Sequence, residues 1–172
     1  GLSAVYACVY RIASTIASLD IEVLQRTDRG TRPADTHPAK NLISYAPNEY
    51  QTAPEFWETL VSYAVATGAG HAYIERDERG YGVSLRCISP ENIEAIHTPL
   101  GEAFKTRDYG VVQAENMLGL YNLQRKSPIR LHRENLGLAA SAHSHGANSY
   151  HNAQMTGILT TDQPLRNEQM DA

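Results

Sequence analysis

The chain has 172 residues, with 15 Lys and Arg, 19 Asp and Glu, and a formal net charge of −4. This length is that of one domain or slightly more, and a hydrophobic content of 42% excludes a disordered tail, a collagen-like repeat and a coiled-coil rod. The acidic balance argues against a generally basic nucleic-acid-binding protein. No apolar run approaches the roughly 20 residues that a membrane-spanning helix requires.

The two cysteines, Cys8 and Cys87, are far apart and fit neither a disulfide framework nor a zinc-binding pattern. We expect both to be small buried side chains. The N-terminus lacks the basic and apolar regions of a signal peptide, and the chain does not begin with Met. We therefore take it as part of a longer protein.

The first elements are mostly helical. Apolar residues recur every three or four positions from Val5 to Leu19, which predicts an amphipathic helix beginning after Ser3. A short strand at 21–24 and a loop over 27–41 are expected next, because the loop segment contains two prolines and many charges. A short helix over 40–45 follows.

The strongest local signal begins the next helix. Thr52, Pro54 and Glu55 form the pattern of a capping box with an early proline, and apolar residues then recur at helical spacing. The segment Gly68-Ala69-Gly70 is too short to bind phosphate and precedes a strand, so we interpret it as the end of this helix.

From residue 71 the hydrophobic period changes to two. Strands at 71–76 and 83–87 are predicted to form a hairpin through the turn at 77–80. A third strand is expected at 93–97 and a fourth at 109–112. The remainder of 98–126 shows no clear pattern.

The longest predicted helix begins at Ser127, the N-cap, with Pro128 in its first turn. It extends to Tyr150, about 24 residues or roughly 36 Å at ~1.5 Å per residue. A strand at 157–161 and the start of a helix at 164–172 follow. The element order predicts an α+β fold in which helices pack on a small mixed sheet with hairpins.

Seven histidines are the first candidates for chemistry. His143 and His145 point about 200° apart on a helix, so they and the nearby His151 lack the spacing of a helical metal site. A polar surface explains them better. His71 and His97 lie at the edges of predicted strands without an assignable partner.

Other catalytic signatures are absent from the sequence. It contains no nucleophile elbow, no phosphate-binding loop and no dinucleotide-binding motif. Carboxylates such as Glu55, Glu75 and Glu134 are scattered and form no pair of catalytic spacing. We therefore expect no enzyme, and we assign no catalytic, cofactor-binding or metal-binding residue.

One basic cluster surrounds the start of the long helix: Arg125, Lys126, Arg130 and Arg133. It either contacts an anion, such as DNA phosphate or an acidic neighbour, or forms a solvated helix face. The solvated face is favoured, because basic residues are common on surfaces and gain nothing from the dipole of a helix N-terminus.

Three stretches in this order resemble the portal proteins of tailed double-stranded-DNA bacteriophages, in the siphophage-type family. The first runs from Ser3 to Leu19. The second contains His37-Pro38-Ala39, the segment 47–56 and the hairpin from Gly70 to Leu85. The third contains Lys126-Ser127-Pro128-Ile129, the segment 148–153 and Gly157-Ile158-Leu159.

This resemblance implies a structural subunit of a ring, typically of twelve copies, at one vertex of the virion capsid. Double-stranded DNA passes through the channel of such a ring during packaging and ejection and is held only weakly. The implied partners are terminase, the head–tail connector and the major capsid protein, and assembly takes place in the host cytoplasm. No cofactor is implied, and the ATPase belongs to the partner.

The resemblance also divides the chain into three parts. Residues 1–126 would form a wing-like α+β region, residues 127–152 a stem-like long helix, and residues 153–172 the start of the clip region. The segment before Ser127 and residues 98–110 are shorter than is usual in the family.

Two other functional classes remain as alternatives. The chain could be a fragment of a metal-dependent hydrolase that uses His143, His145 and His151, which elemental analysis would detect. It could also be a monomeric α+β binding module, which imaging of the intact parent protein would distinguish from a ring.

Overall fold

The computed structural model describes residues 3–99 and 101–151. The chain divides into two compact units between Arg133 and Glu134. No helix within the described residues is both long and apolar enough to span a bilayer.

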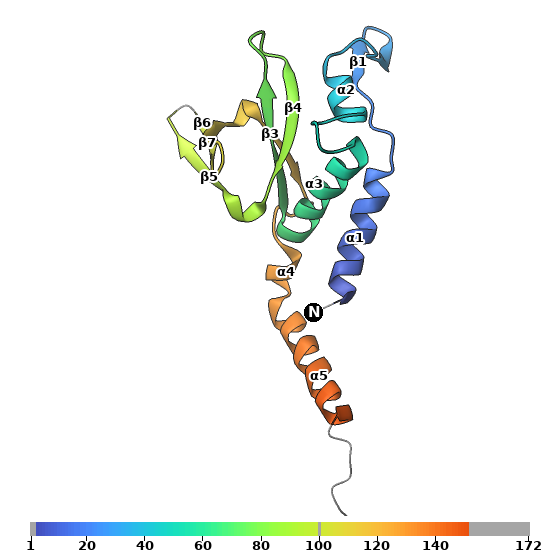
Figure 1. Ribbon diagram of the computed structural model, residues 1–172, viewed down its shortest axis with the longest axis vertical. Helices are drawn as coiled ribbons and strands as arrows, with labels where there is room; N and C mark the ends of the chain where they lie inside the picture. Colours follow the sequence, from blue (N-terminus) through green and yellow to red (C-terminus); the bar gives the residue numbers. More distant parts are fainter. Residues whose placement is uncertain (1–2, 100, 152–172) are drawn as a thin grey trace, which may run out of the picture. The chain divides into compact units, whose positions relative to one another are not determined.

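Helix α1 (Ser3–Ala17) packs against helix α3 (Ala53–Thr67), and the two lie side by side in Figure 1. The contact uses small residues, since Ala13 and Ala17 are the buried residues of α1. This confirms the predicted helix. Cys8, however, is exposed, so the expectation of a buried thiol is wrong at this position.

A hairpin of β1 (Leu24–Thr27) and β2 (Gly30–Pro33) follows α1. The strand expected at 21–24 is displaced along the chain, since β1 begins only at Leu24, and the turn that follows β1 has Gly30 at φ 128°. The expectation of a loop throughout 27–41 is wrong for β2, because backbone pairing, and not burial, defines these exposed strands.

Helices α2 (Ala39–Ser44) and α3 have the predicted boundaries to within a residue or two. Glu55 Oε2 accepts a hydrogen bond from Thr52 N at 2.8 Å, which is the contact that a capping box makes through its glutamate, and a further one from Thr52 Oγ1 at 2.8 Å. Gly68 ends α3 in the left-handed region at φ 104°, whereas Ala69 and Gly70 already belong to the next strand.

The first three-stranded sheet has the order β4–β3–β8 and is antiparallel throughout. Its strands are β3 (Ala69–Arg76), β4 (Gly82–Ile88) and β8 (Met117–Tyr121). Helix α3 packs on this sheet. The buried cluster between them comprises Leu42, Phe56, Leu60, Ala72 and Leu85.

The second sheet has the order β5–β6–β7 and is also antiparallel. Its strands are β5 (Ile93–Thr98), β6 (Gly101–Thr106) and β7 (Gly110–Gln113). Short 3-10 turns η1 (Pro90–Asn92) and η2 (Ala114–Asn116) connect the two sheets. A second core comprises Ile88, Phe104, Val112 and Met117.

Two of these strands, β6 and β8, lie in the region without a clear sequence pattern. In β6 the adjacent residues Ala103 and Phe104 are both buried, so its burial does not alternate. In β8 Gly119 interrupts an otherwise apolar run. The α+β class is confirmed, with helices on small sheets.

The predicted long helix is interrupted. Helix α4 (Pro128–Leu131) ends at His132, whose φ of −108° and ψ of 23° leave the helical region, and helix α5 (Arg133–His151) follows. The prediction of one continuous helix from Ser127 to Tyr150 is therefore wrong. The strand expected at 157–161 and the helix at 164–172 lie outside the described residues.

Candidate functional site

The end of α3 and the end of β8 meet immediately before α4. The Gly68 carbonyl accepts a hydrogen bond from Asn122 N at 3.1 Å. A Cβ atom at Gly68 would lie only 2.8 Å from Lys126 N and Lys126 C. The backbone of 125–126 therefore approaches the α3 terminus so closely that only glycine fits without displacement.

Residues 122–126, here called the Asn122 turn, are organised by one side chain. Asn122 Oδ1 accepts from Gln124 N at 3.2 Å and Lys126 N at 3.3 Å, while Asn122 Nδ2 donates to Lys126 O at 2.8 Å. Arg125 N donates to Asn122 O at 3.2 Å. These bonds hold Arg125 at a positive φ of 50°, which non-glycine residues adopt infrequently.

Ser127 joins this turn to both neighbouring helices. Its hydroxyl donates to Ala66 O of α3 at 2.8 Å and accepts from Arg130 N at 3.2 Å. The second contact is that of an N-cap, as the Ser-Pro signal predicted. The bond to Ala66 O holds the start of α4 against the last turn of α3.

The four basic residues of the predicted cluster are all exposed here. The Arg125 guanidinium lies 4.2 Å from the centre of the Tyr121 ring, which orients it by a cation–π contact. Within the part of the chain that the structure describes, Arg125, Lys126, Arg130 and Arg133 form no ion pair. Their positive charge is therefore available to an outside partner.

His71 lies on β3 at the junction of the two sheets. Its ring centre is 5.0 Å from that of Phe104 and 5.6 Å from that of Tyr121. Its Nε2 atom is buried without a hydrogen-bond partner, and burial lowers the pKa of the imidazole. Next to it is an open cavity of ≈ 690 Å³, whose lining includes His71, Glu91 and Arg130.

The other predicted candidates are not gathered into a site. His97 is exposed on β5, opposite Glu102, and His143 and His145 are exposed on α5. No group of three or more potential metal-ligating residues occurs within 3–99 and 101–151.

The carboxylates named from the sequence are likewise dispersed. Glu55 caps α3, and its pKa is lowered by the backbone and side-chain hydrogen bonds from Thr52. Glu75 Oε2 lies 3.7 Å from Arg86 Nε, and Glu134 lies in the first turn of α5. Cys87 is half-buried, and burial raises the pKa of its thiol to about 12, which disfavours the reactive thiolate.

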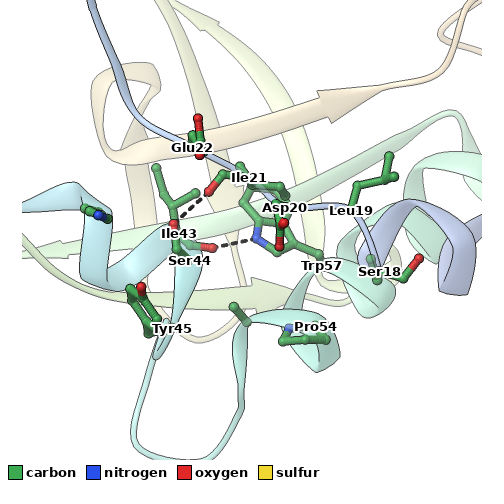
Figure 2. A pocket seen from close by; sticks show the side chains of 13 residues that line it. Ser18, Leu19, Asp20, Ile21, Glu22, Ile43, Ser44, Tyr45, Pro54 and Trp57 are labelled. Atoms are coloured by element: carbon green, nitrogen blue, oxygen red, sulfur yellow. Dashed lines mark hydrogen bonds between the residues drawn. The ribbon is translucent and has the colours of Figure 1, made fainter. Parts of the chain in front are cut away.

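A second hollow lies where the chain leaves α1, and Figure 2 shows its walls. Its volume is ≈ 400 Å³, and Asp20, Glu22 and Trp57 contribute to its lining. Trp57 Nε1 donates to Ile43 O at 2.9 Å, and Ser44 Oγ donates to Ile21 O at 2.7 Å. These bonds connect the segment after α1 to α2 and α3.

Sequence reasoning identified the basic cluster and the Ser127 cap but missed the Asn122 turn. The turn depends on contacts between Asn122 and Gly68, which are far apart in the chain. The only local signal was the Asn itself, a residue that commonly stabilises turns through its side chain.

The two small antiparallel sheets with their packed helices define an α+β fold, and comparisons with known proteins specify the class. A chain from the neck of an empty GTA particle, determined with C6 symmetry, superimposes with a TM-score of 0.62 at 16% identity, covering 96% of this chain and 49% of that one. An HK97-family phage portal protein from Corynebacterium diphtheriae gives 0.59 at 13% identity, covering 95% and 53%. A chain from the native GTA neck, determined with C12 symmetry, gives 0.58 at 15% identity, covering 96% and 48%.

The sequence itself identifies the family. The Phage portal protein family matches residues 3–172, so the chain belongs to that family. The portal protein of Enterobacteria phage HK97 is 28% identical over 95 residues, which are 54% of this chain and 22% of that protein. The chain spans about half the length of the similar solved chains.

Proposed function

We propose that this chain is a structural part of a portal subunit that assembles into a ring at one vertex of a phage or phage-like particle. The observation that carries this proposal is the family match across residues 3–172. The similar chains from particle necks, determined with C6 and C12 symmetry, support a ring, and a count of twelve copies is our proposal.

Within that ring we propose that residues 1–126 form a wing-like region, residues 127–152 a stem-like segment and residues 153–172 the start of a clip region. Helix α5 fits a crowded ring because its exposed surface is rich in small residues, which allow neighbouring helices to approach closely. They are Ala139, Ala140, Ser141, Ala142, Ser144 and Gly146.

We propose that double-stranded DNA passes through the channel of this ring during packaging and ejection without being held. A net charge of −4 suits this role, because binding through many phosphate contacts would retain DNA in a salt-dependent manner. The chain should therefore bind duplex DNA weakly. A sub-micromolar dissociation constant at physiological salt would contradict this part of the proposal.

The proposed partners are terminase, the head–tail connector and the major capsid protein, with assembly in the host cytoplasm and residence at the portal vertex of the virion. Portal proteins are structural, so we propose that the chain has no catalytic residue and that ATP hydrolysis belongs to terminase.

Negative-stain imaging and native mass spectrometry of the intact parent protein test the proposal. Rings of about a dozen subunits are expected. A strict monomer at all protein and salt concentrations would refute it, as would turnover of a substrate by the purified parent protein alone.

A further inference from the structure

Helix α1 leaves one apolar side without a partner. Ile12, Ile16 and Leu19 are 45%, 39% and 62% exposed, and the exposed Cys8 precedes them by one helical turn. Cys8, Ile12 and Ile16 are spaced four residues apart and lie along one side of the helix, and Leu19 follows just beyond its end at Ala17. This surface is here called the α1 row. Helix α1 contacts α3 through Ala13 and Ala17 instead.

The α1 row ends at an acidic edge. Asp20 and Glu22 follow Leu19 directly, both are exposed, and both line the ≈ 400 Å³ hollow in Figure 2. Among the described residues neither carboxylate forms an ion pair, since Lys40 pairs with Asp35. Lys40 also lines this hollow, so the surface combines an apolar row with two exposed carboxylates against one lysine that already pairs with Asp35.

The Asn122 turn offers the opposite combination. Its tip residue, Leu123, is 100% exposed and is followed by the exposed basic residues Arg125 and Lys126. The hydrogen bonds of Asn122 and the close contact with Gly68 already fix the backbone of the turn. A surface that is ordered before binding loses little conformational entropy when it docks.

We propose that the Asn122 turn of one copy packs against the α1 row of the next copy, with Leu123 on Ile12 and Ile16 and Lys126 facing Glu22. This inference rests on the proposed ring. Neighbours in a ring contact each other through two different surfaces of the same chain, and these two surfaces match in hydrophobicity and are opposite in charge.

The proposed contact can be tested by cross-linking the full-length parent protein, because Cys8 already lies on the α1 row. Leu123→Cys combined with the native Cys8 and a short bismaleimide should give a ladder of denaturant-resistant oligomers. Cys87 should contribute little, since its raised thiol pKa disfavours the reactive thiolate. Val111→Cys, at a position 57% exposed on β7, is the matched control and should give no ladder.

A second measurement tests the charge pair in the same protein. Lys126→Glu should weaken ring formation at low salt, by up to about fivefold in the association constant for each contact, as for a good exposed ion pair. Adding Glu22→Lys to Lys126→Glu should restore assembly. Restored ring assembly in the double variant would support the pairing of Lys126 with Glu22 across the interface. Failure of the double variant to assemble would overturn that pairing.

The outcomes separate this inference from the proposed function. The interface would be overturned, and the portal role left intact, if normal rings formed but gave no ladder of cross-linked oligomers. The same holds if the ladder persists in Cys8→Ser or if cross-links form only inside one chain. Absence of rings from the wild-type parent protein would overturn the portal role and this interface together.

Discussion

Gly68 gives the sharpest test of how the unit up to Arg133 is held together. Its φ of 104° disfavours any L-residue, and a Cβ atom would lie 2.8 Å from the backbone of Lys126. The backbone conformation costs an alanine about 1–2 kcal/mol, and displacing a rigid backbone costs about as much again. We therefore expect Gly68→Ala to lower the free energy of unfolding by about 3 kcal/mol.

Gly80 provides the matched control, because it separates the two costs. It also has a positive φ, 83°, but nothing lies within 4 Å of where its Cβ would be. Gly80→Ala should therefore lose only the conformational part, about 1 kcal/mol. The difference between the two variants measures the close approach between Gly68 and the Asn122 turn.

Urea unfolding followed by the fluorescence of Trp57, the single tryptophan, measures both variants. This side chain reports on the packed unit because its indole N–H donates to Ile43 O. In a thermal scan the two variants should differ by several degrees, at ~2–4 °C per kcal/mol for a chain of this size. Equal losses of stability in Gly68→Ala and Gly80→Ala would refute the close approach.

Three further predictions concern the core, the cap and the buried histidine. Phe56→Ala should cost about 3–5 kcal/mol of unfolding free energy, because the side chain is fully buried, whereas Val111→Ala on the exposed strand should change it by less than about 0.5 kcal/mol. Thr52→Ala should cost about 1 kcal/mol and raise the pKa of Glu55, measured by carboxyl NMR, because one of its two hydrogen-bond donors is removed. An unchanged pKa would contradict the hydrogen bond from Thr52 Oγ1. Burial lowers the pKa of His71 below 6.5, so as the pH falls the unfolded chain binds more protons than the folded one, and the free energy of unfolding should decrease below about pH 6.5. His71→Gln should reduce the difference between the unfolding free energies measured in urea at pH 7.5 and pH 5. The same difference in the wild type and the variant would argue against the buried imidazole.

The functional interpretation depends on surfaces, and the sequence predicted these only in part. It located the basic cluster around Ser127, because charge is visible in composition. It did not reveal that Leu123 is fully exposed on an ordered turn, since an isolated leucine in a sequence is ordinarily assigned to the core. It also did not reveal which side of α1 faces α3.

The sequence alone determined the features that nearby residues control. Thr52 with Glu55 begins α3, Gly68 ends it, Gly80 closes the β3–β4 hairpin, and Ser127 caps α4. Each of these boundaries depends on a contact or a backbone preference within a few residues, so the boundary predicted from the sequence agrees with the one in the structure.

Only the tertiary structure decided the features that join distant parts of the chain. The pairing of β8 with β3 brings Tyr121 beside Ala69, and that pairing places the Asn122 turn against the end of α3. The same applies to α1, where packing against α3 selects Ala13 and Ala17 and leaves the larger Ile12 and Ile16 exposed. The energies involved depend on shape and close packing between segments, which hydrophobic spacing along one segment does not encode.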